Sequence, residues 1–172
     1  MIRETAEQTG GERLTFELFL SPRGRVPAGH IHPRQVETFT VLRGRMRFRR
    51  GLRVLYAGPG ESVTMPPGTF HTFLNPGDEP AQVVVQTSPA LRMEEMLRAG
   101  AELGRRRALG LSRWRWAMEG VAFLREYRVE VAPPLVPPWA LALVAQLAGK
   151  GQRPRPLPAA TPARPSQAGF QP

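Results

Sequence analysis

Residues 24–44 read GRVPAGHIHPRQVETFTVLRG, and this stretch contains two of the three histidines of the 172-residue chain, His30 and His32. Glu37 follows five residues later and opens an alternating run. In a strand its side chain would share one face with two apolar residues, Phe39 and Val41. A carboxylate on the apolar face of a strand points toward the interior of the protein. The stretch therefore predicts that two imidazoles and one carboxylate lie beside a buried strand.

A second stretch, GESVTMPPGTFHTFLN at residues 60–75, contains the remaining histidine, His71. His30 and His32 are two residues apart, so on an extended chain their side chains project to the same side. Imidazole nitrogens and a carboxylate oxygen are ligands that divalent transition metals bind. Each histidine taken alone could be an ordinary polar residue. That interpretation weakens because every histidine in the chain falls in this pattern.

Between residues 14 and 87, short runs rich in β-branched and aromatic residues are separated by glycine and proline. These runs are LTFELFL, VETFTVL, RMRFR, LRVLYA, SVTM, TFHTFL and AQVVVQT. Strands of this length and spacing predict a mainly β fold, an antiparallel sandwich or barrel. In RMRFR the alternation places Met46 and Phe48 on a buried face and the arginines on a solvated face.

The two histidine stretches resemble the cupins, a family of antiparallel β-barrel, or jelly-roll, proteins. Both motifs of that family are matched at all ten of their specified positions. In the first motif these positions are Gly24, His30, His32, Glu37 and Gly44, and in the second they are Gly60, Pro66, Gly68, His71 and Asn75. The 15 residues between the motifs make a compact version, as in small microbial single-domain cupins.

The resemblance implies that His30, His32, Glu37 and His71 bind one divalent transition metal ion, which could be Fe, Mn, Ni, Co or Zn. Four protein ligands would leave about two positions of an octahedral shell for water, dioxygen or a substrate. The barrel-facing residues beside them form a candidate substrate pocket: Phe39, Val41, Met46, Phe48, Met65 and Phe73. Such a lining suits a small, partly hydrophobic ligand. Each of these six is equally well an ordinary core residue.

Other motif residues are expected to have structural roles. Gly44 and Gly68 stand where chain reversals need a positive φ, and Pro66 and Pro67 stiffen the approach to the second reversal. Asn75 is expected to close a turn through its side chain and not to contact a substrate.

After Ser88 the spacing of apolar residues changes to that of helices. Ser88 and Pro89 are expected to cap and begin a first helix, and Ser112 to cap a second. The second helix has a broad apolar face that includes Trp114 and Trp116. So wide a face needs a cover, either the barrel, the first helix or another subunit.

We therefore expect a cupin β-barrel over residues 1–90 and a helical extension over residues 91–130, packed on the barrel or on a dimer partner. A proline-rich segment over residues 131–172 is expected to contain a short apolar helix, residues 139–147, and a flexible tail.

The net charge of +10 is unevenly distributed along the chain. Residues 1–90 carry 11 basic and 8 acidic residues, whereas residues 91–172 carry 13 basic and 6 acidic ones. The run Arg105 to Arg107 closes the first expected helix, where cations offset the helix dipole, and no nucleic-acid-binding motif accompanies it. We therefore expect a small-molecule ligand and a homodimer, and no nucleic-acid partner.

The composition excludes several classes of protein. The chain has no cysteine, which rules out disulfides, thiolate metal sites and a cysteine nucleophile. No apolar run reaches the ~18 residues of a membrane span, and the first ten residues lack the apolar stretch of a secretory signal. A cytoplasmic location is expected.

A fold and a metal site do not define a reaction. We expect a metal-dependent oxygenase, dioxygenase-like in its chemistry, that acts on a small organic molecule. No second acid or base is evident beside the predicted ligands, which argues against a decarboxylase that needs a separate proton donor. The alternative is a non-catalytic sensor, in which the cupin binds a small ligand and the helices pass the signal to a partner.

Overall fold

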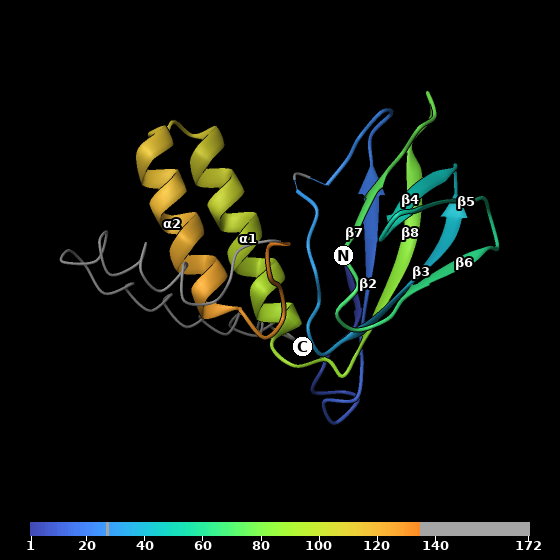
Figure 1. Cartoon of the computed structure of the whole chain (residues 1–172), viewed down its shortest axis with the longest axis horizontal. Helices are drawn as coiled ribbons and strands as arrows, with labels where there is room; N and C mark the ends of the chain where they lie inside the picture. The colour runs from blue at the N-terminus through green and yellow to red at the C-terminus, as the bar shows by residue number, and fades with distance from the viewer. Residues whose placement is uncertain (27, 135–172) are drawn as a thin grey trace, which may run out of the picture.

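The computed structural model describes residues 1–26 and 28–134, and its strands form two antiparallel sheets (Figure 1). The larger sheet has the order β1-β2-β8-β3-β6, and the smaller has the order β5-β4-β7. The strands are β1 (Ile2–Glu4), β2 (Leu14–Leu20), β3 (Val36–Arg43), β4 (Met46–Arg50), β5 (Arg53–Ala57), β6 (Ser62–Met65), β7 (His71–Leu74) and β8 (Ala81–Ser88). The predicted mainly β, cupin-like fold is therefore confirmed, and only β1 was not foreseen.

Alternation along the strands decides which side chains form the core. On β3 the buried residues are Glu37, Phe39 and Val41, and the residues between them are partly exposed. On β4 Met46 and Phe48 are fully buried while the arginines face outward. Apolar side chains from strands of both sheets join one core cluster, to which α1 adds Met93 and Met96. Burial of this inward face is the main favourable contribution to folding.

The two motif glycines predicted at chain reversals both have a positive φ. Gly44 joins β3 to β4 with φ of 80°, and Gly68 has φ of 73° just before β7. Asn75 closes a turn as predicted: its side-chain amide donates to the carbonyls of Ser21 and Glu79, and its oxygen accepts from the backbone N–H of Gly77.

Two helices follow the strands and stand beside them as a hairpin, α1 (Met93–Ala108) and α2 (Arg113–Glu126) (Figure 1). The predicted start of the first helix is wrong. Ser88 ends β8, its hydroxyl donates to the carbonyl of Glu12, and α1 begins only at Met93 without a side-chain cap. Pairing with Val36 of β3 keeps Ser88 in the sheet and out of the helix. Ser112 does cap α2, where its Oγ accepts from the N–H of Arg115.

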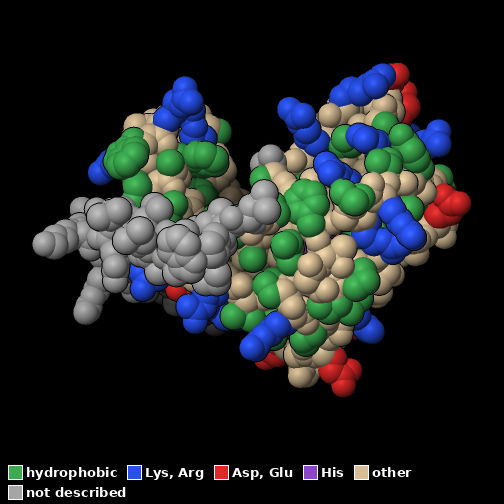
Figure 2. Space-filling view, viewed as in Figure 1, with side chains coloured by type: hydrophobic (Ala, Val, Ile, Leu, Met, Phe, Trp, Pro, Cys, Tyr) green, Lys and Arg blue, Asp and Glu red, His purple; other side chains and the backbone are tan. Residues whose placement is uncertain are grey.

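The apolar face of α2 is incompletely covered within the structure. No residue of α2 is fully buried, and Trp114 and Trp116 expose 73% and 43% of their surfaces. Hydrophobic and basic side chains lie next to each other on the helical part in the space-filling view (Figure 2). The expected cover by another subunit stays a prediction.

After α2 the chain returns to the strands through residues 127–132, which we call the strap. Its last residue, Ala132, exchanges two backbone hydrogen bonds with Ile31, with N–O distances of 2.9 and 2.8 Å. The proposed division into three domains stays a prediction, and the expected 139–147 helix and tail lie outside the described residues. Among the residues described, no helix is both long and apolar enough to cross a membrane.

Candidate metal centre

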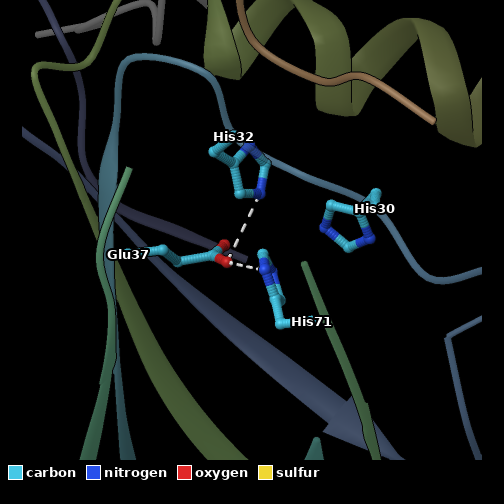
Figure 3. A group of neighbouring side chains, drawn as sticks. All are labelled: His30, His32, Glu37 and His71. Carbon is cyan, nitrogen blue, oxygen red and sulfur yellow. Dashed lines mark hydrogen bonds and ion pairs between the residues drawn. The ribbon is translucent and has the colours of Figure 1, made fainter. Parts of the chain in front are cut away.

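Three separate parts of the chain bring the predicted ligands together (Figure 3). His30 and His32 lie on the extended segment that precedes β3, Glu37 is the second residue of β3, and His71 is the first residue of β7. One ligand atom from each of the four lies within 4.8 Å of the others. The structure thus assembles all four residues that the motifs single out.

Backbone pairing holds the two histidine-bearing segments in register. His30 and His71 exchange two main-chain hydrogen bonds of 3.1 and 2.9 Å. The carbonyl of His32 accepts from the N–H of Gly68, at 2.8 Å, so the loop before β7 is also tied to the histidine segment. These bonds fix the relative positions of the backbone segments that carry the three histidines.

The cluster is buried except at one corner. His32, Glu37 and His71 expose 3%, 5% and 1% of their surfaces, whereas His30 is only half-buried. Its ring nevertheless stays next to the other imidazoles, with its centroid 4.5 Å from that of His71 and 4.9 Å from that of His32 (Figure 3). His30 is therefore the residue of the cluster nearest the surface.

Each imidazole has one ring nitrogen committed to a backbone carbonyl. The Nδ1 atoms of His30, His32 and His71 lie 3.2, 2.5 and 3.0 Å from the carbonyl oxygens of Ala28, Glu130 and Thr69. A carbonyl oxygen only accepts, so the Nδ1 atoms donate and carry the protons. In the neutral ring the Nε2 atom then presents its lone pair to the interior of the cluster.

When Nδ1 carries the proton of a neutral ring, the Nε2 atoms of His32 and His71 and the facing Glu37 oxygen are all acceptors. Glu37 Oε2 lies 3.0 Å from His71 Nε2 and 3.3 Å from His32 Nε2. The longer contact lacks hydrogen-bond geometry, and His32 Nε2 is a buried nitrogen without a hydrogen-bond partner in the described part of the chain. Two acceptors at such distances need either a shared proton or a metal ion between them. The donor set, three imidazoles and one carboxylate, fits a divalent transition metal.

The pKa values of the cluster reflect burial and mutual attraction. Burial raises the pKa of Glu37, but the contacts with His32 and His71 outweigh it and lower the value to about 2. Burial, reinforced by the charges of His71 and His32, lowers the pKa of His30 to about 4. Burial also acts to lower the pKa of His32, yet the Glu37 carboxylate prevails and raises it. The carboxylate is therefore ionised and His30 is neutral near pH 7.

Sequence reasoning missed two further polar groups at this centre. Thr87 lies opposite Glu37 in the β3–β8 register, is fully buried, and its hydroxyl has no hydrogen-bond partner among the described residues. The alternation of β8 could have placed Thr87 on the inward face. Glu130, whose carbonyl meets His32, carries no local signal because the two residues are 98 positions apart.

The six residues predicted to line a substrate pocket are all buried members of the core cluster. Phe39 connects the core to the metal centre: its ring centroid lies 6.3 Å from that of His71, and 5.1 and 4.9 Å from those of Phe48 and Phe73. Phe39 thus places an apolar ring next to His71, and Phe48 and Phe73 pack behind it. A role in substrate binding stays a prediction.

The whole chain was compared with known proteins and solved structures. No curated protein matches the chain. Similar solved structures include the Schizosaccharomyces pombe Cnp3 cupin domain (11% identity, TM-score 0.47, covering 51% of this chain and 58% of that one). Another is an uncharacterised conserved protein with a double-stranded β-helix domain from Klebsiella pneumoniae (25% identity, TM-score 0.46, covering 52% of this chain and 75% of that one). A third is a recombinant oxalate oxidase in complex with glycolate (24% identity, TM-score 0.46, covering 52% of this chain and 50% of that one).

The present chain thus spans little more than half of the Cnp3 domain and half of the oxalate oxidase. The family model described as "Cupin domain" matches residues 17–87, which run from β2 to β8 and include every residue of the four-ligand cluster. Both motifs, the two antiparallel sheets and this match lead to one conclusion: residues 17–87 of the chain are a cupin domain.

Proposed function

We propose that His30, His32, Glu37 and His71 bind one divalent transition metal ion, and that the protein is a metal-dependent oxygenase acting on a small organic molecule. The observation that carries the metal assignment is the orientation of the three imidazoles. All three direct Nδ1 to a backbone carbonyl, and the Nε2 atoms of His32 and His71 face the Glu37 carboxylate. This is the arrangement in which outer hydrogen bonds fix the tautomer of a metal-ligating histidine.

The bound ion would supply Lewis acidity and, for a redox-active metal, one-electron chemistry with dioxygen. The protein's own residues would hold the ion and shape its surroundings. Phe39 limits water on the core side, and the half-buried His30 leaves an approach for a substrate. Thr87 lies opposite Glu37 in the β3–β8 pairing, and its buried hydroxyl could donate a hydrogen bond to a substrate oxygen.

The oxygenase assignment is supported by the scarcity of proton donors. In the described part of the chain, Glu37 is the single carboxylate of the cluster, and it is placed to serve as a ligand. Acid–base reactions such as decarboxylation use a separate group to deliver a proton. An oxygenase reaction at a metal makes less use of such a group.

Metal analysis of the purified full chain tests the first part of the proposal. We expect about one transition metal ion per chain, and a large loss of occupancy in His32→Ala and His71→Ala because an incomplete ligand set binds weakly. Arg34→Ala is a suitable control, since this arginine is exposed and close to the ligands in sequence. Full metal occupancy in a His30→Ala/His32→Ala double variant would refute the assignment.

Oxygen uptake by the metal-loaded protein, measured against a panel of small organic acids, diols and phenols, tests the second part. Turnover that is lost in Glu37→Gln would support an oxygenase. Tight binding of a panel member without turnover would favour the alternative, a sensor that signals through its helices. The strap is the observation that favours this alternative, because it connects the hairpin to the ligand His32.

A further inference from the structure

His32 differs from the other two histidines in where its outer hydrogen bond goes. His30 and His71 use carbonyls two residues away on their own segments, those of Ala28 and Thr69. His32 uses the carbonyl of Glu130, which is 98 residues away and lies outside the cupin domain. Its Nδ1–O distance of 2.5 Å is the shortest of the three. One ligand is therefore oriented by a segment that the barrel does not supply.

The strap is fixed to the strands on one side. Ile31, the neighbour of His32, exchanges two backbone hydrogen bonds with Ala132. Tyr127 and Val131 are buried and belong to the same core cluster as the strands. The position of the Glu130 carbonyl is thus set by contacts immediately before and after it in the chain.

The strap is fixed to both helices on the other side. The Glu130 carboxylate accepts from the backbone N–H of Arg92 at 3.3 Å. The Arg92 guanidinium pairs with Glu95 at the start of α1 and with Glu126 at the end of α2, at 2.7 and 2.8 Å. The same guanidinium lies 5.1 Å from the centre of the Tyr127 ring. Arg92 therefore joins α1, α2 and the strap at the base of the hairpin.

We propose that the strap is a positioning element for the metal centre, so that the helical hairpin and the metal site are energetically coupled. The Glu130 carbonyl holds the His32 ring with Nδ1 protonated and Nε2 directed at the cluster. Any change that moves the strap then rotates or releases one ligand. Because coupling between two sites is reciprocal, an ion that needs His32 in this orientation also stabilises the strap. This inference rests on the proposed metal site.

A backbone substitution in the strap tests the coupling without touching a ligand. Ala132→Pro removes the N–H that bonds to Ile31, whereas Ala132→Ser keeps it and serves as the matched control. Each full-length variant is titrated with Co²⁺ against a competing chelator and followed by visible absorption. Loss of an outer-shell partner typically weakens metal affinity by 10–100-fold, and we expect a loss in this range for Ala132→Pro alone.

A second measurement on the unaltered chain covers the case in which Ala132→Pro fails to fold. Amide hydrogen exchange is compared with and without Co²⁺. We expect slower exchange at Ile31 and Ala132 and along α2, because the ion would lock His32 onto the strap. Protection confined to β3 and β7 would overturn the coupling.

The outcomes separate this inference from the proposed function. If the unaltered chain binds Co²⁺ and Ala132→Pro binds it as tightly as Ala132→Ser, the strap is not a positioning element and only the inference fails. If the unaltered chain binds no Co²⁺ and no other divalent transition metal, the proposed function fails and the inference falls with it.

Discussion

Gly44 permits a sharp test of how the fold is held together, because two separate features at this position exclude a side chain. Its φ of 80° lies in the left-handed region that residues with a Cβ rarely adopt. In addition, a Cβ built on Gly44 would lie 2.9 Å from the Cα of Ala81 and 3.0 Å from the carbonyl oxygen of Pro80. These atoms belong to backbone at the start of β8, so they cannot rotate away as a flexible side chain could.

Gly60 provides a matched control. It has nearly the same backbone conformation, with φ of 84°, yet a Cβ there would meet nothing within 4 Å. For Gly60→Ala, the left-handed conformation costs about 1–2 kcal/mol. The smaller conformational freedom of alanine in the unfolded chain returns about 0.4–1 kcal/mol. A net loss of about 1 kcal/mol in the free energy of unfolding is expected.

Gly44→Ala should have the same backbone cost plus the cost of forcing a methyl group against Ala81. Overpacking of a well-packed region costs typically about 1–3 kcal/mol. Since β8 pairs with both β2 and β3, a shift at its first residue disturbs the central pairing of the larger sheet. For a chain of this size about 1 kcal/mol corresponds to roughly 2–4 °C in Tm, so Gly44→Ala should melt roughly 2–12 °C below Gly60→Ala.

Thermal unfolding of both variants, followed by circular dichroism in the presence of a chelator, measures this difference. The chelator is needed because a bound ion would stabilise the folded state by mass action. Equal melting temperatures for the two variants would show that the close approach to Ala81 does not matter. In that case the argument from backbone contact would be refuted.

Three further predictions concern charge and association. Glu37→Gln should keep the fold because the amide has nearly the same shape, but it should lose most of the bound metal because a neutral oxygen replaces the charged one. Metal analysis and circular dichroism measure the two effects, and retained metal would contradict the ligand role. The exposed tryptophans of α2 should support a homodimer at micromolar concentration, which Trp114→Arg should weaken in light scattering; a monomeric unaltered protein would count against this. Arg105 and Arg106 form ion pairs with Glu102 and Glu119, which offset their charges, so duplex DNA should not bind at physiological salt. Tight, salt-sensitive DNA binding would contradict this expectation.

The strands and the four residues of the buried cluster could be predicted from the sequence because their signals are local. LTFELFL and SVTM coincide with β2 and β6, since a strand's alternation is complete within a few residues. The positions of Gly44 and Gly68 likewise follow from turn geometry that involves only neighbouring residues. The four residues of the cluster were predicted from the spacing of all three histidines and Glu37, together with the resemblance to a known motif.

Other features depended on contacts that no local pattern encodes. Ser88 is a residue type that often caps helices, yet its pairing with Val36 of β3 extends β8 through it, and α1 begins only at Met93. Whether Phe39 lines a pocket or fills the core could not be read from its alternation, because both roles require the same inward face.

The sequence by itself determined which four side chains face the interior together, because motif spacing and strand alternation act over short distances along the chain. Only the tertiary structure decided how one of them is held. The bond from His32 to the carbonyl of Glu130 joins residues 98 positions apart and uses a main-chain atom that every residue possesses. A backbone acceptor has no signature in the sequence, so its partner is determined only when the helices and the strap pack against the strands.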